Sequence, residues 1–103
     1  MTWVLVRHRV EDYGRWRPVF DRHVATLDQI GCRGGQVFRT ADDPNEILVL
    51  LAWEDEERLR AFMTSPELRE KMRESGVIGE PDIRLLDELP APLIGRLSAE
   101  RAA

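Results

Sequence analysis

Residues 46–53 read Glu-Ile-Leu-Val-Leu-Leu-Ala-Trp, and this stretch decides the fold. A strand with one face in water alternates apolar and polar side chains. Here, after Glu46, the side chains on both faces of the strand are apolar. One set is Ile47, Val49, Leu51 and Trp53, and the other is Leu48, Leu50 and Ala52. We therefore predict a strand that is covered on both of its faces.

The segment before this strand pairs with it through a short turn. Residues 33–41 predict a second strand, in which Gly34-Gly35 marks a bulge or a close approach of two backbones. Residues 42–45, Asp-Asp-Pro-Asn, have the composition of a tight turn. Two strands joined by so short a connection form a hairpin.

The N-terminal third supplies one strand and one helix. Residues 2–10 alternate, and one face carries Val4, Val6, His8 and Val10. From Tyr13 to Ile30 apolar residues recur every three or four positions, which predicts a helix that Gly31 ends. Because proline is costly inside a helix, we expect a short turn over residues 11–16 and a main helix that begins near Pro18.

Two short helices are expected after the hairpin. Asp55 is a suitable N-cap for the first, and the acidic residues 56–57 suit the positive end of its dipole. Ser65-Pro66 is typical of a second helix start, and Ser75-Gly76 of its end. This segment therefore supplies a second helical layer after the hairpin.

The last strand completes a β-α-β-β-α-β order. Residues 77–81 are expected to form a loop, residues 82–89 a strand, and residues 90–103 a tail outside the domain of residues 1–89. This order predicts an α+β domain with a four-stranded antiparallel sheet. Both connections place their helices on the same side, so the other face needs a partner. We predict a homodimer through the sheet face; the second interpretation is an unusually apolar monomer.

Composition excludes several functional classes. The chain has 103 residues, enough for one domain, and a net charge of −4, which argues against a general nucleic-acid binder. Its one cysteine, Cys32, forms no internal disulfide, which fits a reducing cytoplasm. We expect no membrane span and no signal peptide, because no apolar run is long enough. We therefore expect a cytoplasmic protein.

The only two histidines are candidate catalytic groups. If the face that carries His8 looks at the helices, His8 and His23 line one cavity, where they would act as general base and orienting partner. The structural alternative is a hydrogen-bonded strand histidine and a helix-edge histidine that reaches water. Two histidines are too few for a zinc site, and we expect no metal.

Aromatic residues suggest what such a cavity would bind. The expected substrate-binding residues are Tyr13, Trp16, Phe20, Arg39 and Phe62. The aromatic rings suit a flat phenolic or polycyclic ligand, and Arg39 a carboxylate. An equally good interpretation is that the rings fill a small core and that the arginine is a solvated strand residue.

Residues 48–68 carry a family resemblance. The stretch Leu-Leu-Ala-Trp-Glu-Asp-Glu-Glu-Arg-Leu-Arg-Ala-Phe at 50–62, followed by Ser-Pro-Glu-Leu at 65–68, resembles the antibiotic biosynthesis monooxygenase family. The resemblance implies a dimeric α+β barrel with a ferredoxin-like protomer. Trp53 matches a strand-end tryptophan of cofactor-free oxygenase members, which implies a catalytic role. Haem-degrading members carry a helix histidine where this chain has Phe62 and Met63, so we expect no cofactor.

The resemblance and the residues together predict a small-molecule enzyme. The expected reaction is cofactor-free oxygenation, isomerisation or cyclisation of an aromatic or polyketide-like substrate. His8 or His23 would be the base, and Trp53 or Tyr13 a hydrogen-bond donor, in a dry cavity. The alternative is a non-catalytic ligand-binding or stress-related dimeric module. A cavity filled by Phe62, Met63 and Trp53 would favour that alternative.

Overall fold

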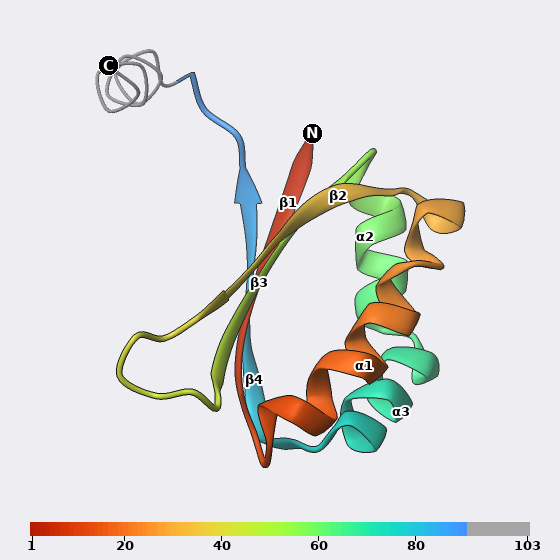
Figure 1. The fold of residues 1–103 in the computed structure, drawn as a ribbon. Coiled ribbons are helices and arrows are strands. Elements are labelled where there is room, and N and C mark those ends of the chain that lie inside the picture. Colours follow the sequence, from red (N-terminus) through yellow and green to blue (C-terminus); the bar gives the residue numbers. More distant parts are fainter. Residues whose placement is uncertain (91–103) are drawn as a thin grey trace.

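The computed structural model describes residues 1–90, and its elements follow the expected β-α-β-β-α-β order (Figure 1). The elements are β1 (Thr2–Val10), α1 (Tyr13–Val24), the 3₁₀ helix η1 (Leu27–Ile30), β2 (Cys32–Arg39), β3 (Glu46–Trp53), α2 (Glu56–Met63), α3 (Pro66–Ser75) and β4 (Val77–Asp87). The sheet is antiparallel with the strand order β2-β3-β1-β4. The α+β class is therefore confirmed. Apart from Pro90, the expected tail lies outside the described residues.

Side-chain caps begin the helices where polar residues follow the strands. Asp55 accepts a hydrogen bond from the backbone N–H of Arg58 at 2.8 Å, and Ser65 accepts one from that of Leu68 at 3.3 Å. Gly76 ends α3 in the left-handed region with φ of 85°. The predicted starts and the predicted end are thus confirmed, because each cap satisfies backbone groups that a helix terminus leaves free.

Pro18 does not begin a helix. α1 runs without a break from Tyr13, and Asp12 caps it by accepting from the N–H of Gly14 at 3.1 Å. A proline removes the bond to the carbonyl four residues earlier, here that of Gly14. Gly14 is exposed, so water can satisfy this carbonyl. The expected turn over residues 11–16 is therefore wrong.

The predicted long helix is divided in two. α1 ends at Val24, and η1 carries the chain on to Gly31, whose φ of 118° needs a glycine. Gly31 is thus a helix terminus, as predicted, but the helix that it ends is η1 and not the long helix that begins at Tyr13. The division matters for the site because it follows directly after His23.

β4 begins earlier than expected. The predicted loop over residues 77–81 is wrong, because Val77 pairs with Val10 and Ile78 with Arg9. The register shifts where β4 passes from Ile78, opposite Arg9, to Asp82, opposite Arg7, and the extra residues of β4 interrupt its alternation, which hid the start of this strand in the sequence. Pro81 is tolerated because β4 is an edge strand.

The hairpin has the irregularity that its glycines predict. The register between β2 and β3 shifts between Cys32 and Gly34, and Gly34 has a φ of 124°. At Gly35 a Cβ atom would collide with the backbone carbonyl of Leu50. Both the bulge and the close approach of the backbones are confirmed.

The sheet has one face under the helices and one face that the described residues leave uncovered (Figure 1). We call them the inner face and the open face. The inner face carries Val4, Val6, His8, Val10, Ile47, Val49, Leu51 and Trp53. The open face carries Trp3, Leu5, Phe38, Leu48, Leu50 and Leu86. The two apolar sets of β3 therefore lie on opposite sides, and the set of Leu48 is the open one.

Candidate active site

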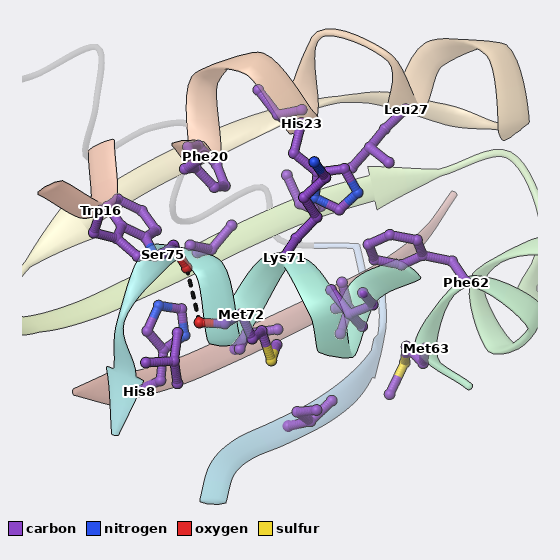
Figure 2. Close-up of a pocket in the computed structure, with 18 residues that line it drawn as sticks. His8, Trp16, Phe20, His23, Leu27, Phe62, Met63, Lys71, Met72 and Ser75 are labelled. Atoms are coloured by element: carbon purple, nitrogen blue, oxygen red, sulfur yellow. Dashed lines mark hydrogen bonds between the residues drawn. The ribbon is translucent and has the colours of Figure 1, made fainter. Parts of the chain in front are cut away.

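A cavity of ≈70 Å³ lies between the inner face and the helices (Figure 2). Residues from β1, α1, η1, β3, α2, α3 and β4 line it, and nearly all of them are apolar. The exceptions are His8, His23, Lys71 and Ser75. Any chemistry in this cavity therefore depends on these few polar groups.

His8 is the most unusual of them. Its side chain is 7% exposed, and neither ring nitrogen has a hydrogen-bond partner among the described residues. Burial lowers the pKa of His8 from 6.5 to about 4, because the charged form loses its hydration. At neutral pH the ring is therefore uncharged, and it offers one donor and one acceptor. Buried polar groups are seldom left unpaired, which makes this ring a candidate ligand contact.

Ser75 lies on α3 at the same end of the cavity as His8 (Figure 2). It is 4% exposed, and its hydroxyl donates to the carbonyl of Met72 at 3.1 Å. The oxygen keeps lone pairs that can accept a further hydrogen bond. The sequence interpretation missed Ser75 as a site residue. Its spacing from Leu68 and Met72 places it on the apolar side of α3, and this was the available signal.

His23 descends from α1 toward α2 and meets Phe62, with ring centroids 5.9 Å apart (Figure 2). Burial lowers the pKa of His23, and the positive charge of Lys71 lowers it further, while Glu67 acts in the opposite direction. Both histidines line the same cavity, as the sequence predicted from the face that carries His8. Their catalytic roles stay predictions.

Three of the predicted substrate-binding rings line the cavity: Trp16, Phe20 and Phe62. Trp16 stacks on Phe20, with centroids 4.7 Å apart and planes inclined by 16°. On its other side Trp16 packs against His8, with centroids 5.6 Å apart. A planar ligand in the cavity would therefore lie beside a stacked aromatic pair and an uncharged imidazole.

Trp53, Tyr13 and Arg39 lie elsewhere. Trp53 is fully buried behind Phe62, with centroids 4.9 Å apart, and its Nε1 has no partner among the described residues. The hydroxyl of Tyr13 accepts a hydrogen bond from Arg17 at 3.0 Å. The guanidinium of Arg39 lies 5.0 Å from the centre of the Tyr13 ring. These three residues do not belong to the lining of the cavity.

Residues of α2 and α3 that the sequence interpretation did not assign to the site complete the wall. Met63 and Met72 line it, as does Lys71, whose Nζ pairs with Glu74 at 3.3 Å.

In the part of the chain that the structure describes, no three His, Cys, Asp or Glu residues are grouped as metal ligands. Nor is any helix there both long and apolar enough to cross a membrane.

Solved structures with this fold include an antibiotic biosynthesis monooxygenase, which is 16% identical with a TM-score of 0.69, over 87% of this chain and 100% of that chain. SnoaB, a cofactor-independent oxygenase from Streptomyces nogalater, is 16% identical with a TM-score of 0.72, over 87% of this chain and 94% of that chain. Rv0793 from Mycobacterium tuberculosis is 16% identical with a TM-score of 0.69, over 87% and 96%. At these identities the likeness shows the fold, and it agrees with a ferredoxin-like protomer. A search of curated proteins finds no match.

The family model described as antibiotic biosynthesis monooxygenase matches residues 6–74. The match runs from within β1 to the last turn of α3 and includes residues 48–68, which carry the resemblance. It thus includes most of the elements that enclose the cavity. The chain belongs to the antibiotic biosynthesis monooxygenase family.

Proposed function

We propose that this protein is a homodimeric enzyme that transforms an aromatic or polyketide-like small molecule in the cavity, either by cofactor-free oxygenation or by isomerisation or cyclisation. One observation carries the proposal: the uncharged ring of His8 is buried in an apolar cavity with both nitrogens unpartnered among the described residues. The name of SnoaB as a cofactor-independent oxygenase supports the first reaction.

In this proposal His8 accepts a proton from the substrate. An imidazole with a pKa of about 4 is a weak base, but an anion formed beside it would stabilise the imidazolium. The substrate carbanion would then transfer an electron to dioxygen, and the two radicals would combine to a peroxide. Loss of water would leave a carbonyl, so that a CH₂ group and O₂ yield C=O and H₂O. The protein supplies the base, the aromatic walls and the exclusion of water.

The open face of the sheet supports the homodimer. Phe38 is 50% exposed and Leu86 38% exposed, although both are large apolar side chains. Apolar surface of this extent commonly marks an interface, and a second copy would bury it. Light scattering should give a mass twice the 11.9 kDa of the chain. A stable monomer at micromolar concentration would contradict this part of the proposal.

Oxygen uptake with anthrone and quinol substrates tests catalysis. We expect His8→Leu to lower the rate about 100-fold or more, as the loss of a general base does. His23→Ala should also lower it, whereas Arg22→Ala, one position away on the exposed side of α1, should not. The catalytic proposal fails if no substrate turns over, or if the His8 variant matches the wild type.

A second candidate function is a non-catalytic ligand-binding module. It is favoured by the small volume of the cavity, ≈70 Å³, and by the presence of Phe62 and Met63 in its wall. Trp53, which the same alternative expected in the cavity, lies behind Phe62 instead. Binding of 2-naphthol without turnover of any oxygenation, isomerisation or cyclisation substrate would support this second function.

A further inference from the structure

A second hollow adjoins the cavity. A cleft of ≈620 Å³ opens between η1, α2 and the start of α3, and its wall includes Thr26, Gln29, Ile30, Arg58, Ser65 and Glu67. We call it the outer cleft. It shares the side chains of His23, Leu27 and Phe62 with the cavity. These three residues are therefore the partition between the two spaces.

Two members of the partition are only half-buried. His23 comes from α1 and Phe62 from α2, and their rings meet at 5.9 Å without stacking (Figure 2). Side chains at the surface change rotamers within nanoseconds, whereas a buried wall is fixed by its packing. A rotation of these two rings would join the cavity to the outer cleft without any movement of the backbone.

The sizes of the two spaces call for such a connection. Pockets for small molecules measure roughly 300–1,000 Å³, whereas the cavity alone has ≈70 Å³. Met63 and Met72 line the cavity, and their flexible side chains can adapt to a ring. A ligand of ordinary size would still extend beyond the cavity, and the outer cleft is one adjoining space with hydrogen-bonding walls.

We propose that the outer cleft is the entrance to the cavity, that His23 and Phe62 are its gate, and that the cleft binds the uncharged polar end of an elongated ligand whose aromatic end lies beside Trp16 and His8. This inference rests on the proposed function, in that it requires a small molecule in the cavity. It adds the route, the gating residues and the chemical character of the part of the ligand that stays outside.

The charges of the outer cleft explain the preference for an uncharged end. Arg58 is already paired with Glu54 at 3.2 Å and with Asp55 at 3.6 Å. Glu67 adds a negative charge, so among the described residues of its wall the cleft offers an anion no unpaired positive charge. Gln29 supplies a neutral amide donor and acceptor, and Thr26 and Ser65, whose hydroxyls donate to the carbonyls of His23 and Phe62 at 2.7 Å, supply acceptors. A hydroxyl-rich group such as a sugar, or an amide, matches this wall.

A competing route exists on the other side of α1. A groove of ≈710 Å³ between α1 and β2 shares Phe20, Val24 and Leu51 with the cavity. We expect this partition to be the more rigid, because Phe20 stacks nearly parallel on the buried Trp16 and Leu51 belongs to the sheet, whereas Phe62 meets Trp53 and His23 only at tilted angles. The groove therefore provides an internal comparison for the gate.

The first test compares the two partitions by stopped-flow fluorescence with 2-naphthol and 2-naphthyl β-D-glucoside. Phe62→Ala should raise the association rate of both probes about tenfold, because a step that must precede binding slows association. Phe20→Ala should lower affinity without raising that rate. His23→Ala is a second gate variant, and it should accelerate association even if Phe62→Ala does not fold. Faster association through Phe20→Ala alone would overturn the route.

The second test uses two adjacent residues of η1. Gln29 lines the outer cleft, whereas Asp28 lines the opposite groove. Loss of one hydrogen bond should weaken the glucoside about 3- to 10-fold in Gln29→Ala. Binding of 2-naphthol should not change there, and Asp28→Ala should leave both probes unaffected. If 2-naphthyl phosphate bound more tightly than the glucoside, the proposal that the outer cleft binds an uncharged polar group would be wrong.

The two levels of the account fail in different ways. If 2-naphthol binds, but neither gate variant accelerates it and Gln29→Ala equals Asp28→Ala, the inference is wrong and the ligand cavity stands. If neither probe binds to the wild type or to the gate variants, both the inference and the proposed cavity site are wrong.

Discussion

Strand β3 presents apolar side chains to both the inner face and the open face of the sheet, yet the two faces differ in what covers them. On β3, Ile47 and Trp53 of the inner face are fully buried under the helices. On the open face, Phe38 of the neighbouring strand is 50% exposed among the described residues. The apolar side chains of β3 therefore belong to a closed core on one side and to a partly exposed surface on the other.

The difference also explains why one polar residue matters more than others. His8 is the polar member of the inner-face set of β1, and its burial without a partner has a cost in stability. Arg7 and Arg9 on the open face reach water at no such cost. On the closed side, a buried polar group is therefore the feature that indicates a functional site. On the open side, an exposed apolar group is the feature that indicates an interface.

The largest expected effect separates neighbouring residues of β3. Val49→Asp places a carboxylate in the closed core, and we expect a loss of more than about 4 kcal/mol, enough to unfold the chain. Leu48→Asp places the same group on the open face, where the protomer should fold but stay monomeric. Circular dichroism and light scattering distinguish the two results.

Arg69→Glu is the control, because it adds an acidic group on the helical side of the protein. Arg69 is exposed on α3, so this variant should keep both the fold and the dimer. If Leu48→Asp remains a dimer, the open face is not the interface. If Val49→Asp folds normally, the division into two faces is wrong.

The sequence predicts the division of the sheet into two faces, because side chains alternate between the faces with a period of two along residues 46–53. It also predicts that His8 and His23 share a cavity, since one strand face and one helix stripe determine that. It does not predict that Phe62 separates Trp53 from the cavity, because this depends on how large rings pack in three dimensions. The irregularity of β4 between Ile78 and Asp82 likewise hid the start of that strand.

Acid should act mainly through the inner face. The pKa of His8 is about 4 in the folded chain and 6.5 in the unfolded chain, so the unfolded state binds more protons between these values. Stability should therefore be full above pH 6.5 and fall by about 3 kcal/mol as the pH drops to 4. Urea unfolding between pH 7.5 and 4 measures this, with His8→Leu as the variant that lacks the His8 contribution.

Removal of the unpartnered ring should stabilise the protein. We expect His8→Leu to raise the free energy of unfolding at pH 7 by about 1–2 kcal/mol, because it replaces two unpaired buried nitrogens with apolar surface. The same variant should lose activity, which is the usual relation between stability and a functional site. A variant that is less stable than the wild type would indicate that His8 is a structural residue with satisfied hydrogen bonds.

A substitution on the outside of helix α2, away from both faces of the sheet, gives the baseline for changes in the free energy of unfolding. Arg60 pairs with Glu56 at 3.0 Å on α2, and both side chains are more than half exposed. Arg60→Ala should change the free energy of unfolding by less than about 0.5 kcal/mol, as exposed pairs do. Thermal unfolding monitored by circular dichroism is sufficient, and a larger loss would mean that helix α2 depends on its surface charges.

The central claim is that His8 is an uncharged, accessible hydrogen-bonding group in the cavity, and histidine side-chain NMR tests it most directly. The chain has two histidines, so His23→Ala assigns the resonances without ambiguity. We expect the His8 ring to remain neutral from pH 7.5 down to pH 5, and its nitrogen shifts to move when 2-naphthol is added. A ring that titrates near 6.5, or one that does not respond to the ligand, would contradict the account.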